Sequence, residues 1–435
     1  MKFYNRQKEI TSLREIETNS KEIAQMTVMV GRRRIGKTTL LKHAFENTPT
    51  LYFFVAKKNE VLLCEELSNE IEDKLSVSIG HFQRFAELFK ALMILSQERN
   101  FTFIIDEFQE FYNLNSSVFS DMQNIWDSYK EKSRINLILC GSIYSMMKRI
   151  FESSKEPLFG RATSKMIIKP FNIATIKEIL RDYYADYTPE DLLTFYMVTG
   201  GVAKYIEQLV QSKAFTKRNI LNTVFKENSY FIGEGKDVLI DEFGRDYSNY
   251  FSILSLIASS KTERGEIESV LGMPIGGYLD KLENEYSIIK RVRPFGAKEG
   301  SRSNKYLIED NFLNLWFRFI YKFRSAVEIG NLEYVRDIVE RDYEAYSGIV
   351  LEKYFKSKMI DLKEFSDIQG YWDKKGENEI DIVAVNDFEK RLLFCEVKRN
   401  PKKINLTTLE NKAKELVKKY SEYSVEYKGL SINNM

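Results

Sequence analysis

Short apolar runs alternate with amphipathic stretches over the first 170 residues. The runs are rich in β-branched and aromatic side chains, as is typical of strands, and they lie at 27–31, 51–56, 101–106, 135–140 and 165–170. Helical periodicity fills residues 59–75 and 82–97. Strands that are apolar throughout indicate a parallel sheet buried on both faces, and their alternation with helices predicts an α/β layered domain.

The pattern changes after residue 170. Residues 171–235 read as helices, and Thr188 before Pro189 is a helix-start signal because threonine caps the backbone and proline fits the first turn. Further on, three helices and two strands are predicted, at 247–260, 263–272, 273–288, 288–296 and 303–310. Three helices followed by a hairpin predict a winged helix-turn-helix.

Basic residues gather on the predicted hairpin, at Lys290, Arg291, Arg293, Lys298 and Arg302. Such charges suit contacts with DNA phosphates. The third helix carries acids instead, at Asp280, Glu283 and Glu285. A winged helix used for protein docking or oligomerisation is therefore the alternative to DNA binding.

An aromatic stretch, 311–323, has helical spacing and is predicted to be a core helix. A second α/β pattern follows it. Its predicted elements are a helix at 346–359, strands at 379–385 and 391–399, a helix at 406–420 and a strand at 426–432.

Composition narrows the classes of protein. The chain has 435 residues, is 43% hydrophobic and 29% charged, and has a net charge of +2, so a nucleic-acid surface would have to be a local patch. Its three cysteines are widely spaced and its two histidines are too few for a histidine-built zinc site. No apolar run reaches membrane-spanning length and the amino terminus lacks a signal-peptide core, which indicates a cytoplasmic protein.

A phosphate-binding motif follows the first strand directly. It reads Gly31, Arg32, Arg33, Arg34, Ile35, Gly36, Lys37, Thr38, Thr39 and matches G-x-x-x-x-G-K-[ST] between a strand and a helix. Glycines let backbone N–H groups surround phosphates, and the helix start favours negative charge. We expect this segment to bind ATP, with Lys37 on the β- and γ-phosphates and Thr38 on Mg²⁺.

Two acids end the strand at 101–106. Asp106 and Glu107 lie at its carboxyl end, where open α/β sheets bind ligands. Asp106 is predicted to hold Mg²⁺ through its shell, and Glu107 to polarise the attacking water. The adjacent glutamate favours an ATPase over a small GTPase.

With these motifs, residues 1–235 resemble the AAA-related ATPases common in archaea and some bacteria. The segments that carry the resemblance are FYNRQKEI (3–10), LILCGSIYSMM (137–147) and PLFGRAT (157–163). The resemblance implies that Asn5 and Arg6 approach the adenine and that Ser142 senses the γ-phosphate. It also implies that Arg161 stabilises transition-state charge, in cis or from a neighbouring subunit of a homo-oligomer.

The carboxyl-terminal pattern resembles the PD-(D/E)xK nuclease core, and a domain of this kind is commonly attached to this ATPase family. The matching residues are Asp381, Glu396 and Lys398, with Glu352 on the preceding helix. The resemblance implies that Glu352, Asp381 and Glu396 ligate Mg²⁺ or Mn²⁺ and that Lys398 activates water. The alternative is a plain ion network in which Lys398 neutralises the acids.

The fold class is thus predicted to be multidomain α/β. Its parts are a P-loop ATPase core (1–170), a helical lid (171–235), a winged helix (236–310), a helical connector (311–345) and a nuclease-like domain (346–435). The predicted function is an ATP-hydrolysing protein acting on or near DNA through the winged helix and the last domain. Two alternatives stay open: a nucleotide-controlled protein-interaction switch, and a nuclease whose ATPase only regulates access.

Overall fold

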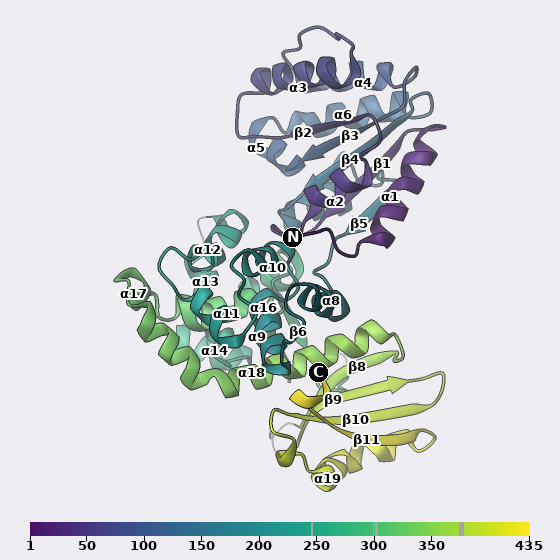
Figure 1. Cartoon of the computed structure of the whole chain (residues 1–435). Coiled ribbons are helices and arrows are strands. Elements are labelled where there is room, and N and C mark those ends of the chain that lie inside the picture. Colours follow the sequence, from purple (N-terminus) through teal and green to yellow (C-terminus); the bar gives the residue numbers. More distant parts are fainter. Residues whose placement is uncertain (245–246, 299, 301–302, 374–377) are drawn as a thin grey trace. The chain divides into compact units, whose positions relative to one another are not determined.

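The computed structural model describes residues 1–244, 247–298, 300, 303–373 and 378–435. It divides into two compact units (Figure 1). One unit comprises Asn5–Lys169, and the other comprises Met1–Tyr4 together with Pro170–Met435. The division into five domains expected from the sequence stays a prediction.

The unit Asn5–Lys169 is built on a five-stranded sheet in the order β2-β3-β4-β1-β5, with every pairing parallel. The predicted parallel sheet is therefore confirmed. Its strands are β1 (Gln25–Val30), β2 (Thr50–Phe54), β3 (Phe101–Asp106), β4 (Ile135–Gly141) and β5 (Ser164–Ile167). Strands β3 and β4 are buried along their whole length, as their unbroken apolar runs require.

Helices cover both faces of this sheet. One face packs into a large apolar core with helices α3, α4, α6 and α7, and the first two of these also contact each other. Helices α1 and α2 contact each other, and α1 contacts β1 and β4. The helix bounds are α1 (Gln7–Ser20), α2 (Lys37–Ala44), α3 (Glu60–Leu75), α4 (Phe85–Leu95), α5 (Phe111–Leu114), α6 (Ser117–Tyr129) and α7 (Tyr144–Glu152).

The second unit begins with helices. They are α8 (Ile173–Tyr183), α9 (Pro189–Thr199), α10 (Ala203–Gln211), α11 (Lys217–Val224) and α12 (Tyr230–Phe243). The predicted start of α9 is confirmed, because Thr188 and Asp191 cap each other's backbone in a capping box and Pro189 stands in the first turn.

Three helices and a hairpin come next, in the order expected from the sequence. They are α13 (Tyr247–Ala258), α14 (Arg264–Leu271), α15 (Gly276–Asp280) with a π-helical continuation (Lys281–Glu285), and the antiparallel strands β6 (Ile289–Val292) and β7 (Lys305–Ile308). The aromatic stretch forms α16 (Asn311–Leu315) and a π-helical turn (Trp316–Tyr321), and its side chains Phe312, Leu315 and Phe317 are fully buried.

One long helix connects the helical part to the final sheet. After the short α17 (Arg324–Glu328), helix α18 runs over Leu332–Leu362, so the expected helix at 346–359 is only its second half. Asn331 caps its first turn by accepting from the backbone N–H of Tyr334. The expected connector and the expected last domain thus share one continuous helix.

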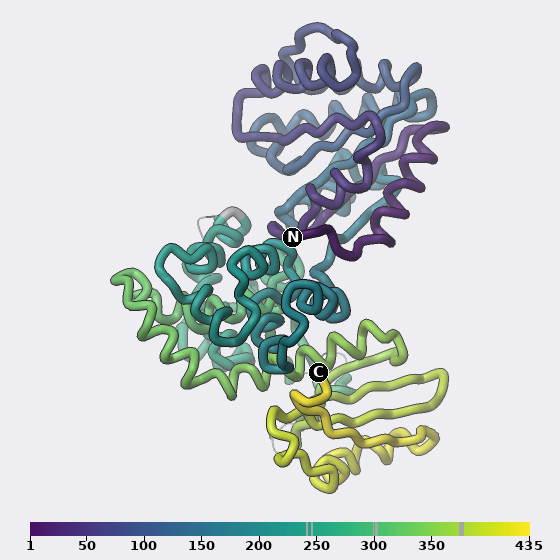
Figure 2. The backbone as a smooth tube through the Cα atoms, in the orientation of Figure 1, coloured from purple at the N-terminus to yellow at the C-terminus, as the bar shows by residue number. Residues whose placement is uncertain are grey.

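The chain ends in a four-stranded sheet in the order β11-β10-β9-β8. Figure 2 shows the backbone of this part at the yellow-green end of the colour scale. Strands β8 (Asp367–Trp372), β9 (Glu379–Asn386) and β10 (Arg391–Lys398) are antiparallel neighbours, and β11 (Ser424–Ser431) is parallel to β10. Helix α19 (Leu406–Val417) packs into the core of one face, and α18 also contacts the sheet. Strand β8 has no counterpart among the sequence-based predictions.

In the parts of the chain that the structure describes, no helix is both long enough and apolar enough to span a membrane.

Candidate functional site

Three parallel strands of the first sheet end side by side. The P-loop follows β1, Asp106 closes β3, and Ser142 follows β4, which lies between the other two. Since neighbouring strands are about 4.8 Å apart, the P-loop and Asp106 are separated by roughly two strand spacings with Ser142 in between. The carboxyl edge therefore gathers the predicted nucleotide-binding groups.

The P-loop backbone adopts conformations that its sequence must tolerate. Gly36 has a φ of 95° and Arg34 a φ of 73°, both in the left-handed region. Gly31 is closely packed, because a Cβ there would lie 3.1 Å from the carbonyl oxygen of Ile168 and 3.2 Å from the Ile35 side chain. Ile35 is buried and anchors the loop in the core.

Lys37 lies under this loop with its side chain almost completely buried. Its Nζ donates to the carbonyl oxygen of Gly31 over 2.6 Å. Burial lowers the pKa of Lys37, while the nearby carboxylates of Asp106 and Glu107 act in the opposite direction. A phosphate group at this position would supply the negative charge that a buried ammonium needs.

Thr38 and Asp106 face each other across the gap between the P-loop and β3. Thr38 Oγ1 donates to Asp106 Oδ2 over 3.3 Å, and Asp106 Oδ1 accepts from the backbone N–H of Glu107 over 3.0 Å. The hydroxyl of Tyr52, from β2, donates to the same Oδ2 and lies 3.4 Å from Thr38 Oγ1. Burial raises the pKa of Tyr52, so this hydroxyl keeps its proton.

Glu107 is held by its backbone and by two neighbours. Its φ of 55° is unusual for a glutamate and aims its side chain away from the course of the strand. Glu107 Oε2 accepts from Ser142 Oγ over 2.7 Å and from the amide of Gln109. Gly141 makes room for this arrangement, since a Cβ there would lie 2.6 Å from Gln109 Oε1.

The remaining loop residues differ in exposure. Arg32 and Arg33 are half-buried, while Arg34 and Thr39 are exposed. Arg33 Nε donates to Ser142 Oγ over 3.4 Å, which links the P-loop to the end of β4. Their contacts with a nucleotide stay predictions.

Asn5 and Arg6 both have left-handed backbones, with φ values of 54° and 75°. Asn5 Oδ1 accepts from the backbone N–H of Arg6 over 2.7 Å. The buried guanidinium of Arg6 donates to the carbonyl oxygen of Lys169 over 2.7 Å and pairs with Glu9 over 3.0 Å. Arg6 thus joins the two ends of the unit Asn5–Lys169, and the adenine contact expected for this pair stays a prediction.

Arg161 lies at the other edge of the sheet. Thr163, two residues on, donates its backbone N–H to Met26 at the start of β1, whereas the P-loop follows the end of that strand, roughly 13 Å of β-strand away. The sheet therefore lies between Arg161 and the P-loop of its own chain in this structure. Its expected action, in cis or from a neighbouring subunit, stays a prediction.

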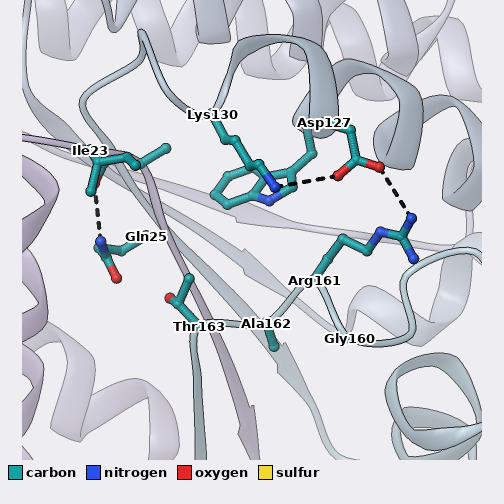
Figure 3. A pocket seen from close by; sticks show the side chains of 10 residues that line it. Ile23, Gln25, Asp127, Lys130, Gly160, Arg161, Ala162 and Thr163 are labelled. Carbon is teal, nitrogen blue, oxygen red and sulfur yellow. Dashed lines mark hydrogen bonds and ion pairs between the residues drawn. The ribbon is translucent and has the colours of Figure 1, made fainter.

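Figure 3 shows the surroundings of Arg161, a cavity of about 480 Å³. The guanidinium pairs with Asp127 over 3.1 Å, and Lys130 approaches the same carboxylate at 3.8 Å. Trp126 also lines the cavity. Two cations thus share one anion at this edge.

The expected residues of the C-terminal domain come together on β9, β10 and α18. Lys398 Nζ lies 3.3 Å from Asp381 Oδ2 and 3.8 Å from Glu396 Oε1. Asp381 Oδ2 also accepts from the backbone N–H of Val397 over 2.7 Å, and Glu396 Oε2 accepts from that of Asn405 over 2.9 Å. Both acids are thus held by backbone donors as well as by the lysine.

Glu352 completes this group from α18. Burial raises its pKa to about 7, and the charge of Asp381 adds to the rise, while Lys356 and Lys398 oppose it. Among the residues that the structure describes, however, no three acids, histidines or cysteines are close enough to hold one metal ion. Both expectations for this group, a metal site and an ion network, stay predictions.

The hairpin β6–β7 carries the expected basic residues, of which Lys290, Arg291 and Lys298 are exposed and Arg293 is half-buried. Arg291 Nε lies 3.4 Å from Glu283 Oε2 on the preceding helical segment, so an acid of the third helix already pairs with the hairpin. Arg302 lies outside the described residues.

Sequence reasoning missed two residues at the carboxyl edge. Tyr52 was read only as part of an apolar strand, although it is the one hydroxyl-bearing aromatic in LYFFVA. Gln109 is fully buried beside Glu107 with no sequence motif to mark it. Spacing alone does not predict the Tyr52 contact, because it depends on how strands far apart in the chain are aligned. The Gln109 contact is local, but it forms in the turn after β3, for which the sequence has no motif.

The fold and this edge together define the chain as carrying a P-loop ATPase domain. Residues 3–209 match a family described as an ATPase domain predominantly from Archaea, and residues 316–415 match a family of archaeal and bacterial proteins of unknown function. A relative, the uncharacterized protein MJECL04 of Methanocaldococcus jannaschii, is 30% identical over 405 residues, 91% of this chain and 87% of that protein. The chain therefore belongs to the same family as this relative, an archaeal-type P-loop ATPase with a C-terminal domain of unknown function.

Solved structures resemble the fold. The Walker-type ATPase PABY2304 of Pyrococcus abyssi is 19% identical, with a TM-score of 0.56 over 72% of this chain and 96% of that one. The ORC2 protein of Aeropyrum pernix, solved as ADPNP and ADP complexes, is 13% identical with a TM-score of 0.48, covering 78% of this chain and 96% of that one. The likeness to the Pyrococcus protein supports the α/β ATPase fold.

Proposed function

We propose that this protein binds and hydrolyses ATP at the carboxyl edge of the five-stranded sheet. The observation that carries the proposal is the meeting of Lys37, Thr38, Asp106, Glu107 and Ser142 from three strand ends. Lys37 would exchange its contact with the Gly31 carbonyl for the phosphates, because phosphate oxygens carry the charge that a carbonyl lacks.

The donors at this edge suit Mg²⁺. Thr38 Oγ1 and Asp106 Oδ2 are hard oxygen atoms 3.3 Å apart, a separation at which both can face one ion or its water shell. When bound, Mg²⁺ would neutralise charge on the β- and γ-phosphates. Thr38 would be its direct protein ligand, and Asp106 would hold its waters.

Glu107 is the proposed general base. Its Oε2 accepts from Ser142 and Gln109, which leaves Oε1 to take the proton of an attacking water. Ser142 orients the base, and its hydroxyl accepts a hydrogen bond from Arg33 of the P-loop.

Two variants test these roles. Lys37→Ala should strongly weaken ATP binding, because the buried cation is lost. Glu107→Gln should bind ATP like the parent but hydrolyse it slowly, because it keeps the shape and loses the base. Titration of a fluorescent ATP analogue and phosphate release measure the two effects. Equal loss of ATP binding in both variants would overturn the assignment.

We further propose that DNA is the partner of this ATPase. The basic hairpin around Lys290 and Arg291 supports contact with phosphates. ATP turnover measured with and without single- and double-stranded DNA tests the proposal, since stimulation by DNA is expected. Nucleotide-dependent capture of a protein partner with no effect of DNA would favour the interaction switch instead.

A second candidate function is metal-dependent nuclease activity in the C-terminal domain. The meeting of Glu352, Asp381, Glu396 and Lys398 favours it. Because the described residues do not bring three acids within reach of one ion, we derive no cleavage step. DNA cleavage with Mg²⁺ or Mn²⁺ that persists in Lys37→Ala and disappears in Lys398→Ala would support this activity, and absence of cleavage by the parent protein would exclude it.

A further inference from the structure

Tyr52 lies at the proposed magnesium site, although it belongs to neither the P-loop nor the acidic strand end. Its hydroxyl donates to Asp106 Oδ2 and lies 3.4 Å from Thr38 Oγ1. The three oxygens come from β2, the start of α2 and the end of β3. The phenol of Tyr52, from a third element, thus lies against Thr38 and Asp106, the pair proposed to bind the ion.

The position of Tyr52 is fixed from both sides of its strand. Its residue pairs with Ile104 in the parallel register between β2 and β3. Its backbone N–H, on the free side of the edge strand, donates to Glu70 Oε1 on α3 over 2.7 Å. The hydroxyl is therefore held in place by the sheet and by a helix rather than by the P-loop.

The Asp106 carboxylate is in turn held at both oxygens. Oδ1 accepts from the backbone N–H of Glu107 over 3.0 Å, and Oδ2 accepts from Tyr52 and from Thr38. A phenol has a single proton, so Tyr52 donates to the carboxylate and leaves the lone pairs of Thr38 for another partner. This orientation is the one needed by an ion that Thr38 would bind directly and whose waters Asp106 would hold.

We infer that Tyr52 is a positioning residue for the Mg²⁺–nucleotide complex, holding Asp106 toward Thr38 through its hydroxyl. The inference rests on the proposed ATPase function. Partners that hydrogen-bond to metal-binding carboxylates typically change metal affinity by about 10- to 100-fold, because they fix the orientation of the carboxylate. Tyr52 thus controls the metal-dependent part of nucleotide binding and leaves the phosphate contacts of the loop intact.

The test compares the full-length parent with Tyr52→Phe, which removes one oxygen and keeps the ring. Binding of Mn²⁺ to the protein–nucleotide complex is followed by electron paramagnetic resonance, and binding of a fluorescent ATP analogue is measured with Mg²⁺ and with EDTA. We expect Mn²⁺ to bind about 10-fold more weakly in Tyr52→Phe, and nucleotide affinity in EDTA to match the parent. Equal or tighter Mn²⁺ binding would overturn the inference, because Tyr52 would then be neutral toward the ion or a competitor for its site.

Three comparisons make the result specific. Tyr423→Phe removes a hydrogen bond of the same kind, to Asp387 at 2.9 Å outside the ATPase core, and should behave like the parent. In an Asp106→Asn background, Tyr52→Phe should add little, since it acts through that carboxylate. A fully additive effect would contradict this route, and loss of nucleotide binding in EDTA would show that Tyr52 supports the loop rather than the metal.

The failure of the inference is distinguishable from failure of the ATPase proposal. If the parent protein hydrolyses no ATP and its nucleotide complex binds no Mn²⁺, both are overturned. If the parent shows metal-dependent binding and Tyr52→Phe equals it, only the role of Tyr52 is lost.

Discussion

Ser142 donates a hydrogen bond to the Glu107 carboxylate across 2.7 Å, joining the ends of two adjacent strands. Ser142 therefore orients the proposed base, Glu107, already without a nucleotide. Because Arg33 donates to the same hydroxyl oxygen, Ser142 links the P-loop to Glu107 through side chains alone. Its expected role as a γ-phosphate sensor would operate through this link. A phosphate that attracts Ser142 or Arg33 would change the hydrogen bond that Ser142 donates to Glu107.

We predict that Ser142→Ala lowers ATP turnover with little change in ATP affinity. Loss of one hydrogen bond to a charged group corresponds to about 1.5–3 kcal/mol, so a fall of roughly 10-fold or more in kcat is expected. Glu107→Gln should cost more, about 100-fold or more, because it removes the base itself. Steady-state phosphate release with saturating ATP measures both effects.

Ser128→Ala serves as the control for this prediction. Ser128 is an exposed serine on α6 whose hydroxyl donates to the backbone oxygen of Asn124, so its loss should leave turnover unchanged. Turnover of Ser142→Ala equal to that of Ser128→Ala would mean that Glu107 needs no help from the serine.

Arg161 makes a prediction about assembly. If a neighbouring subunit supplies the arginine to the P-loop, Arg161→Ala should lower turnover by at least about 10-fold. Mixing Arg161→Ala with Glu107→Gln should then restore some activity, because mixed interfaces combine an intact base with an intact arginine. Phosphate release across a series of mixing ratios measures the rescue.

Lys130→Ala is the matched control, because Lys130 shares the Asp127 carboxylate with Arg161. It should retain turnover and need no rescue. Normal turnover in Arg161→Ala would end the arginine-finger hypothesis and leave the residue as a surface ion pair with Asp127.

The hairpin β6–β7 gives predictions of opposite sign for its arginines and for Glu283. Arg291→Glu combined with Arg293→Glu should weaken DNA binding at low salt and reduce the slope of log affinity against log salt by about 2, one for each lost phosphate contact. Glu283→Gln should strengthen DNA binding, because Glu283 competes with phosphate for Arg291 at 3.4 Å. Fluorescence anisotropy over a range of salt concentrations measures both changes.

A charge-matched control for the wing is Lys90→Glu combined with Lys132→Glu, two exposed lysines of the ATPase core. It changes the net charge equally without touching the hairpin. If this control weakens binding as much as the wing variant does, the effect is one of net charge. If neither variant changes DNA affinity at low salt, the result favours the alternative in which the predicted winged helix serves protein docking or oligomerisation.

The sequence predicts the ATPase core well because its signals are local. The phosphate-binding motif, Gly31 to Thr39, is identified by its own residues between a strand and a helix start, without any knowledge of tertiary structure. Unbroken apolar runs identify the buried parallel strands. The carboxyl-edge rule then brings Asp106 to the P-loop.

Other features depend on contacts that no local pattern encodes. The position of Arg161 depends on the return of the chain to the amino end of β1, where Thr163 pairs with Met26. Helix α18 is longer than expected since its first half packs residues such as Val335 and Tyr343 into the helical part of the chain. Tyr52 needed the register of β2 against β3 to reach Asp106.

Glu352 yields a prediction about pH. Its pKa of about 7 in the folded chain lies above its ordinary value of 4.5, with burial as the main cause, Asp381 and Glu379 adding to it and Lys356 and Lys398 opposing it. Between these two values the folded chain holds a proton that the unfolded chain has lost, so the free energy of unfolding decreases as the pH rises from about 4.5 to 7 and then levels.

Glu352→Gln lacks this titration and should therefore be more stable than the parent around pH 8, by about 1–3 kcal/mol, with the difference shrinking toward pH 5. The full chain is titrated with urea in EDTA at the two pH values. Each sample then receives a deuterium pulse at one fixed pH, and mass spectrometry of β9 and β10 peptides measures the local stability. Glu410→Gln, an exposed acid on α19, should show no such pH-dependent gain. An equal gain for Glu352→Gln at both pH values would mean that Glu352 affects stability through packing rather than through its charge. The acids Glu352, Asp381 and Glu396 would then hold no charge repulsion that a bound cation could relieve.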